Sequence, residues 1–488
     1  MRSNQKIFLL TALGILSQIS SIIMGVILVR VYNQSDYGTF RQALFITDTV
    51  GYICTFALPA SLLFLIPGEP AGFQKGIFHQ TQALLTGFGF IGSACLFFLA
   101  GPLSVSFHNP DLKGILRFFC LYPLFHVAIQ HIPAWFMGLD RYKTSAWVQT
   151  LTTLTRFIVV AVPAAMGVAL IPLLAILIAF MGLQALVQWL WCLYDKRGDR
   201  STWKPEFLRR QLDYSIPLGL SGIVWYVSKE IDKYLVATFV TPSEYALYSV
   251  GALEIPLFNA LSVAISSVLV PKIVQHLRDG ERDEIPGLWR EVIRRSIFVF
   301  IPCAAILFAV SIPMIGFLYT KEYIAAVIIF QVYLLKIPMR IFNPNLILQG
   351  IGKTKVLLIF TATFLISNTV LTYLCLKVLQ VGLWGPALAS VVSSLLTSML
   401  SMIVTQHLLK VKFLQVFPMV YFLKVSALSI VAAAAGWYTH HWIDTYWLQG
   451  LAAGTLFTVV FLGPALYFRL TTWEELGNYA PFLKKKGA

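Results

Sequence analysis

The sequence contains few charged residues for its length. Of its 488 residues, 12% are charged and 58% are apolar, and the mean hydropathy is +0.75. A soluble domain is ordinarily about half apolar and about one quarter charged, so this chain has too many apolar side chains to keep away from water. The composition therefore excludes a soluble globular protein and predicts an integral membrane protein.

Several motifs that would indicate a metal site or an enzyme are also missing. The six cysteines stand singly in apolar stretches without a CxxC spacing, which argues against a disulfide framework and against a zinc site. The histidines do not pair at the spacing of metal ligands on a helix. Gly352-Lys353-Thr354 is not a P-loop, because Ile347 stands where the motif requires glycine. We therefore predict no metal, no cofactor and no ATPase activity.

Long apolar runs follow one another along almost the whole chain. A helix needs about 20 apolar residues to cross a membrane. The sequence predicts an all-α integral membrane protein of about fourteen transmembrane helices, placed at 7–29, 43–66, 80–100, 115–137, 145–168, 170–193, 215–239, 251–271, 296–319, 323–349, 354–377, 382–407, 419–439 and 447–468.

The formal net charge of +15 comes mostly from loops on one side of these helices. Two basic clusters, at 196–210 and 272–295, lie on that side, which the positive-inside rule makes cytoplasmic. Both termini are then predicted to be cytoplasmic. The chain offers no basic soluble domain for a nucleic acid, so we predict no nucleic-acid partner and interpret the clusters as solvated loops that touch anionic membrane lipid at most.

The chain also repeats itself. Ser35 to Phe40 is echoed by Ser243 to Tyr248. Two further pairs share the same offset of roughly 210 residues: Ala60 to Pro67 and Ala264 to Pro271 end equivalent predicted helices, and Gly138 to Lys143 and Gly350 to Lys355 follow equivalent ones. Each offset spans six helices, so the two halves have the same orientation and a pseudo-two-fold axis along the membrane normal should relate them. The predicted organisation is an N-terminal six-helix lobe at 1–194, a cytoplasmic linker at 195–214, a C-terminal six-helix lobe at 215–408, and two additional helices with a cytoplasmic tail at 409–488.

With these segments, the chain resembles the oligosaccharide flippase family of the multidrug/oligosaccharidyl-lipid/polysaccharide exporter superfamily. The resemblance rests on the repeated Ser-acid-Tyr segments at 35–40 and 243–248, on Asp232-Lys233, and on the short basic loops after Gly138 and Gly350. It implies two six-helix lobes around a central cavity. It also implies movement of undecaprenyl-diphosphate-linked sugars across a bacterial inner membrane, for surface polysaccharides such as O-antigen and lipopolysaccharide.

Charged side chains inside the predicted helices are the candidate site residues. A charge at the centre of a span costs about 2.5–3.5 kcal/mol on insertion scales, so it must be paired, reach the surface or face water. The helix at 215–239 holds most of them. Trp225, Lys229, Asp232 and Lys233 share one helical stripe, and Glu230 flanks it. Two interpretations stay open: internal neutralisation by pairs three residues apart, or the wall of a hydrated cavity with a lysine for a ligand.

Two more helices carry inward-facing cations. Lys336, Arg340 and Asn343 form a stripe at 323–349, where Pro338 and Pro344 interrupt the helix. Arg156, at 145–168, either lines the cavity or pairs with a buried acid such as Asp48 or Asp232. Together the stripes hold an excess of cations, which suits a diphosphate because Arg and Lys form charge-assisted hydrogen bonds with phosphate.

The sequence thus predicts a flippase that is not an enzyme and works by alternating access. Asp48, Glu230 and Asp232 could couple transport to H⁺ or Na⁺, or only pair with cations. A polysaccharide polymerase and chain-length machinery are expected partners in the same process. Two alternatives remain: a cation-coupled multidrug and toxin exporter of the same superfamily, or a membrane-embedded glycan polymerase or ligase.

Overall fold

The computed structural model describes residues 3–194, 205–342, 344–351, 353–468 and 470–471. The regular elements in these ranges are all helices, which confirms the all-α prediction. The chain forms two compact units, Met1–Ser249 and Val250–Ala488. The predicted basic linker and C-terminal tail lie partly or wholly outside the described residues. The predicted lobes, which were defined by the sequence repeat, stay a prediction.

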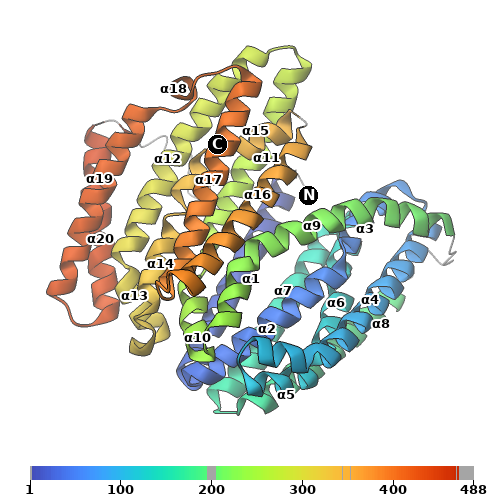
Figure 1. Ribbon diagram of the computed structural model, residues 1–488. Coiled ribbons are helices and arrows are strands. Elements are labelled where there is room, and N and C mark those ends of the chain that lie inside the picture. The colour runs from blue at the N-terminus through green and yellow to red at the C-terminus, as the bar shows by residue number, and fades with distance from the viewer. Residues whose placement is uncertain (1–2, 195–204, 343, 352, 469, 472–488) are drawn as a thin grey trace, which may run out of the picture. The chain divides into compact units, whose positions relative to one another are not determined.

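The first unit contains ten helices within the described residues. They are α1 (Ser3–Val31), α2 (Gln34–Thr55), α3 (Leu58–Leu65), α4 (Ala71–Ser106), α5 (Pro110–Phe118), α6 (Tyr122–Gly138), α7 (Tyr142–Ala165), α8 (Leu170–Tyr194), α9 (Pro205–Phe239) and α10 (Pro242–Gly251), the last of which runs on into the second unit. Helix α1 packs along α7, and α6 packs against α2, α3, α4, α7 and α8 (Figure 1).

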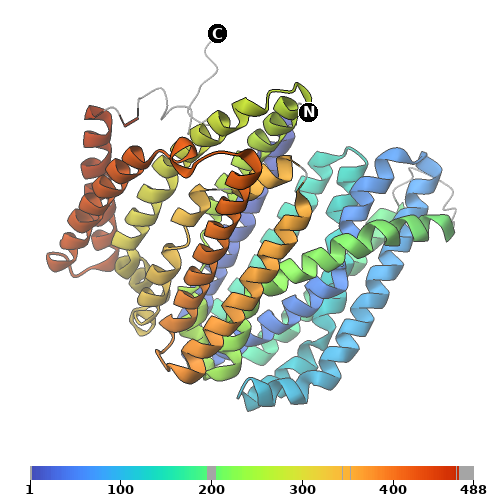
Figure 2. The ribbon, with the colours of Figure 1, turned by 45° about the horizontal axis from the view of Figure 1, so that its top comes forward.

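The second unit begins with the last turn of α10. Its further helices are α11 (Pro256–Arg278), α12 (Ile285–Ala309), α13 (Ser311–Tyr319), α14 (Ala326–Leu334), α15 (Pro344–Gly350), α16 (Thr354–Tyr373), α17 (Trp384–Leu409), α18 (Phe413–Val416), α19 (Met419–Tyr438) and α20 (Tyr446–Tyr467). Helices α19 and α20 form an antiparallel pair beside α12 (Figure 2).

Ten helical segments among the described residues are long and apolar enough to cross a membrane. They overlap with ten of the fourteen predicted spans, but the predicted span at 296–319 is wrong as one helix, because α12 ends at Ala309 and α13 begins at Ser311. Four predicted spans are not among these ten segments. The first predicted span lies at α1 and the seventh at α9, while the eighth lies at α11 and the tenth at the segment from α14 to α15. The structure thus establishes a multi-pass membrane protein, and the count of fourteen stays a prediction.

The predicted interruption at 323–349 is confirmed. Helix α14 ends at Leu334, a short 3₁₀ helix η5 (Pro338–Ile341) follows, and α15 begins at Pro344. Proline has no N–H to donate and its ring clashes with the preceding turn, so each proline begins a new element. The stripe of Lys336 and Arg340 therefore does not lie on one continuous α-helix, since Lys336 stands in the turn before η5.

The repeated segments begin α2 and α10, and hydrogen bonding explains their acidic residue. The Asp36 carboxylate accepts from the Asn33 side-chain NH₂ at 2.9 Å, and the Asn33 side-chain oxygen accepts from the Asp36 backbone N–H at 2.8 Å. Glu244 accepts from the backbone N–H of Thr241 at 2.8 Å and from its hydroxyl at 2.9 Å. Both are N-terminal caps, in which a side chain satisfies an N–H that the first turn leaves unpaired. The acid recurs because each copy starts a helix.

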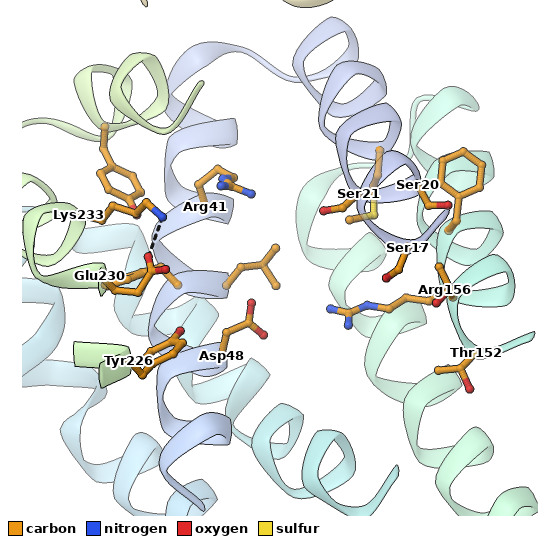
Figure 3. A pocket seen from close by; sticks show the side chains of 16 residues that line it. Ser17, Ser20, Ser21, Arg41, Asp48, Thr152, Arg156, Tyr226, Glu230 and Lys233 are labelled. Atoms are coloured by element: carbon orange, nitrogen blue, oxygen red, sulfur yellow. Dashed lines mark hydrogen bonds and ion pairs between the residues drawn. The ribbon is translucent and has the colours of Figure 1, made fainter. Parts of the chain in front are cut away.

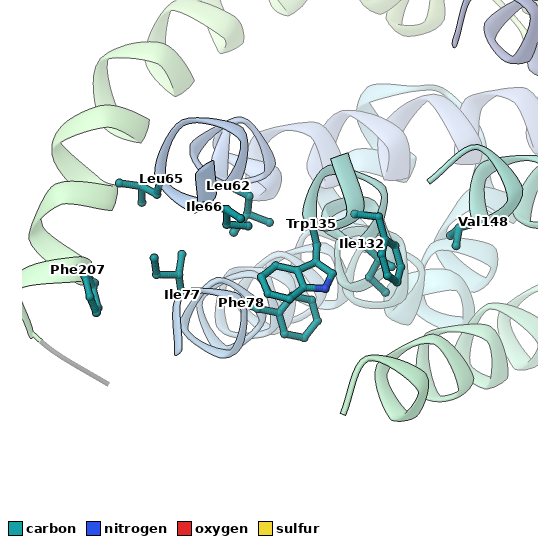
Figure 4. Close-up of a cluster of buried hydrophobic side chains, with 10 residues drawn as sticks. Leu62, Leu65, Ile66, Ile77, Phe78, Ile132, Trp135, Val148 and Phe207 are labelled. Atoms are coloured by element: carbon teal, nitrogen blue, oxygen red, sulfur yellow. The ribbon is translucent and has the colours of Figure 1, made fainter. Parts of the chain in front are cut away.

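The start of α9 is held against α3 and α4 by buried polar contacts. The Gln211 side chain donates to the hydroxyls of Ser61 at 2.8 Å and Thr81 at 2.7 Å, and accepts from Gln80 at 2.7 Å. All four residues are buried. An apolar cluster continues the contact: Phe207 of α9 belongs to the same cluster as Leu62, Phe78 and Trp135 (Figure 4). Helix α9 is thereby fixed within the first unit.

Candidate functional site

A pocket of about 390 Å³ opens between α1, α2, α7 and α9 of the first unit, and we call it the charged pocket (Figure 3). Five of the described residues that line it carry a formal charge. Two are acidic and three are basic: Asp48, Glu230, Arg41, Arg156 and Lys233. The remaining polar groups are hydroxyls, from serines and threonines of α1 and α7 and from Tyr226 and Tyr245. Cations thus outnumber carboxylates by one among the described residues of this lining.

Arg156 and Asp48 are linked through a buried tyrosine. The Arg156 guanidinium donates to the Tyr122 hydroxyl at 2.5 Å, and that hydroxyl donates to Asp48 Oδ1 at 2.8 Å. The guanidinium carbon also lies 5.5 Å from the centre of the Tyr122 ring, a cation–π distance. Tyr122 is fully buried at the start of α6. Arg156 thus lines the pocket and shares a hydroxyl with Asp48, and the two alternatives for it stay open.

Lys233 and Glu230 form an ion pair on the α9 side of the pocket. Their Nζ and Oε2 atoms are 2.7 Å apart, and Lys229 Nζ lies 3.7 Å from the other carboxylate oxygen. The predicted pairing of Glu230 with Lys233 is confirmed. Asp232 lies elsewhere: it is 2% exposed and accepts a hydrogen bond from the Tyr248 hydroxyl at 3.2 Å. Helix α9 therefore neutralises part of its own charge.

The face of α9 that lines the pocket differs from the predicted stripe. Tyr226, Glu230 and Lys233 line it, at positions i, i+4 and i+7. Trp225 and Lys229 are not among the lining residues; Trp225 is 54% exposed, and the Lys229 ammonium lies 5.9 Å from the centre of its indole. The structure thus brings one member of the predicted stripe, Lys233, into the pocket with the flanking Glu230.

The predicted cations of the second unit have partners there. The Lys336 ammonium lies 5.2 Å from the centre of the Tyr333 ring and 5.8 Å from that of Phe364. Arg340 interacts electrostatically with Glu254, which precedes α11. The predicted helix contains no acid, so this partner comes from another element. Asn343 lies outside the described residues.

Sequence reasoning missed Arg41, which stands just before the predicted span at 43–66. Arg41 stands on α2 seven residues before Asp48, so the two side chains share a face of the helix and both line the pocket. The i, i+7 spacing from an acid inside a span was the signal that could have found it. Within the described residues, no group of three or more His, Cys, Asp or Glu side chains is placed to hold a metal ion.

Comparison with known proteins identifies the family of the chain. The sequence profile of the family described as polysaccharide biosynthesis protein matches residues 77–328, just over half of the chain. The chain belongs to this family. Among curated proteins, 114 residues are 22% identical to a probable lipid II flippase MurJ of Rhizobium meliloti (strain 1021). That match covers 23% of this chain and spans about one fifth, 21%, of the length of the relative.

Solved structures share the fold over most of the chain. The lipid II flippase MurJ in an inward closed conformation superposes with a TM-score of 0.70 at 15% identity, covering 94% of this chain and 99% of that one. An inward-facing multidrug resistance MATE family transporter of the MOP superfamily superposes with a TM-score of 0.65 at 11% identity, covering 81% and 94%. These likenesses show that the chain shares the fold of these two solved structures.

Proposed function

We propose that this protein is a flippase that moves an undecaprenyl-diphosphate-linked oligosaccharide across a bacterial inner membrane for surface polysaccharide biosynthesis. One observation carries the proposal: Arg41, Arg156 and Lys233 gather around a polar pocket within a chain that otherwise spans the membrane. Membership of the polysaccharide biosynthesis protein family supports a glycan as cargo. The likeness to a lipid II flippase supports a lipid-linked one.

The pocket suits a diphosphate for electrostatic reasons. A phosphate that loses its water needs several charged donors, and arginine offers a planar fork of N–H groups that matches two phosphate oxygens. Arg156 already donates one of its N–H groups to Tyr122, which fixes the orientation of the remaining ones. Lys233 is shared with Glu230, so binding of an anion there would compete with the ion pair. That competition would let a diphosphate alter the contacts of α9.

We further propose that transport proceeds by alternating access, without an enzymatic step, and that both termini are cytoplasmic. Lys336 and Arg340 are proposed as additional substrate contacts from the second unit, together with Asn343. A polymerase with its chain-length machinery would use the exported glycan. O-antigen of lipopolysaccharide is one glycan of the required class.

The alternative is a cation-coupled multidrug exporter, which the fold likeness to a MATE transporter supports. Such a protein needs carboxylates that can meet a cation. Here Asp48 accepts from Tyr122, and Glu230 is paired with Lys233. These contacts favour the flippase over the exporter. A glycan polymerase or ligase would need a catalytic domain outside the membrane, and the described loops between the helices are short.

Transport in proteoliposomes tests the proposal. The purified protein is reconstituted with a fluorescent undecaprenyl-diphosphate-linked oligosaccharide, and its outward movement is followed by access to a membrane-impermeant reagent. We expect protein-dependent movement that Arg156→Gln reduces strongly. Arg117→Gln is the matched control. Arg117 lies near the end of α5 against the Phe97 ring and does not line the charged pocket. Equal rates in empty liposomes would end the proposal.

The same assay addresses ion coupling. We propose that Asp48, Glu230 and Asp232 include the group that binds H⁺ or Na⁺, if transport is coupled to either ion. Imposed gradients of each ion, collapsed separately by an ionophore, distinguish the two ions from transport driven by the substrate gradient. A cationic dye that is exported while the lipid-linked glycan is not would favour the multidrug exporter.

A further inference from the structure

A second cavity of about 410 Å³ lies next to the charged pocket, between α1, α6, α7 and α8 of the first unit. Its volume is in the range of sites for small ligands. Its most frequent polar side chain is glutamine, with one contributed by each of the four helices: Gln18, Gln130, Gln149 and Gln184. We call it the glutamine cavity.

The two cavities share a wall. Ser17, Thr152, Thr153 and Arg156 line both of them. In Figure 3, Ser17, Thr152 and Arg156 lie on the opposite side of the charged pocket from Lys233 and Glu230. A ligand group held by Arg156 would therefore stand at the junction, and the rest of that ligand could extend past Arg156 into the glutamine cavity.

The glutamine cavity differs from the charged pocket in its chemistry. Among the described residues that line it there is no carboxylate, and Arg156 at the junction is the one arginine or lysine. Each amide offers both a donor NH₂ and an acceptor oxygen. Sugar hydroxyls, which donate and accept, match such a lining, whereas a cationic drug would find no acid and an acyl chain would leave the amides unpaired.

Two of the four glutamines are open to a ligand. Gln130 accepts from Thr55 and contacts His126, and Gln149 donates to Ser145 at 3.2 Å. Within the described residues, Gln18 and Gln184 make no side-chain hydrogen bond. Their amides belong to α1 and α8, so a ligand that bonded to both would bridge two helices. No hydrogen bond or ion pair among the described residues uses their amides, so replacing them tests ligand binding most directly.

We propose that the glutamine cavity binds the uncharged, hydroxyl-bearing sugars of the transported lipid, next to the diphosphate at Arg156. The inference rests on the proposed flippase function and assigns the two parts of the substrate to two different cavities. The charged pocket recognises the diphosphate that all such carriers share. The glutamine cavity recognises the glycan, and replacement of its amides should change which glycans are accepted.

The test measures equilibrium binding to the full chain in nanodiscs with two lipids, undecaprenyl diphosphate and the same lipid carrying a neutral oligosaccharide. The double variant Gln18→Met/Gln184→Met keeps side-chain length and removes both amides. We expect its affinity for the glycan-bearing lipid to fall about tenfold, since two neutral hydrogen bonds are lost, while that for the bare lipid stays within about twofold. Arg156→Gln should weaken binding of both lipids. Gln82→Met is the matched control, because Gln82 of α4 lines neither cavity.

The outcomes separate the inference from the proposed function. If the double variant binds the glycan-bearing lipid like the unmodified protein, or loses affinity for both lipids equally, the glutamine cavity is not the sugar site although the flippase proposal stands. If the unmodified protein binds neither lipid, the proposed function fails and the inference with it. A selective loss for the glycan-bearing lipid, with a Gln82→Met variant that binds normally, supports the inference.

Discussion

Arg156 donates a hydrogen bond of 2.5 Å to the hydroxyl of Tyr122. Tyr122 is fully buried and does not line the charged pocket, so it acts on a ligand only through the arginine that it holds. The same hydroxyl donates to Asp48, which keeps a carboxylate close to the guanidinium. Tyr122 is therefore a positioning residue.

Replacing Tyr122 with phenylalanine should slow transport of the lipid-linked glycan about tenfold or more. A hydrogen bond to a charged group contributes about 1.5–3 kcal/mol, and without it the guanidinium is free to turn toward Asp48. The proteoliposome assay measures the transport rate. The affinity for undecaprenyl diphosphate, measured in nanodiscs, should fall as well. Tyr438→Phe is the control, because that side chain of α19 is 59% exposed. An unchanged rate would show that Arg156 needs no such support.

The lysines of α9 should contribute unequally. Lys233 lines the charged pocket and Lys229 does not, so Lys233→Ala should abolish transport while Lys229→Ala retains a larger share of it. Arg340→Ala in the second unit is expected to abolish transport as well. Rates are compared at equal amounts of inserted protein. Full activity in all three variants would show that the assigned site is wrong, and equal losses at Lys229 and Lys233 would contradict the assigned face of α9.

Gly38 should tolerate no larger residue. A Cβ atom built on it would lie 1.9 Å from the carbonyl oxygen of Pro242, a backbone atom at the start of α10. Gly38→Ala should destabilise the protein by about 1–3 kcal/mol, as overpacking does. The midpoint of thermal unfolding in detergent should fall. Gly87→Ala is the matched control and should not lower the midpoint, because nothing lies within 4 Å of the added Cβ and alanine favours a helix. Equal midpoints for the two variants would contradict the close approach.

Gln211 should be needed for stability rather than for binding. Gln211→Leu removes three hydrogen bonds and leaves the buried side chains of Gln80, Ser61 and Thr81 with fewer partners. A buried polar group without a partner costs about 1–3 kcal/mol, so the unfolding midpoint should drop. Arg209→Leu, on the same helix with a side chain that is 87% exposed, should have little effect. A normal midpoint for Gln211→Leu would show that the network does not hold α9.

Much of the architecture could be predicted from the sequence because the bilayer imposes strict requirements on it. A span needs a long apolar run with its backbone bonded internally, so helix type, ten of the spans and the break at Pro338 and Pro344 were predictable. The site was predictable in part. The cost of burying charge identified Arg156 and Lys233. Arg41 was missed because it stands before the predicted span at 43–66, although α2 extends over it and places it on the same face as Asp48.

The sequence by itself determined that this is an all-helical membrane protein with an excess of cations inside it, because composition and periodicity act along one chain. Only the tertiary structure decided which of those cations meet. Helical spacing places Lys229 and Lys233 on one broad stripe, but the packing of α9 against its neighbours turns only Lys233 into the pocket. Likewise, Tyr122 joins Arg156 to Asp48 from a third helix. Such contacts depend on the mutual rotation of helices distant in sequence, which no local pattern specifies.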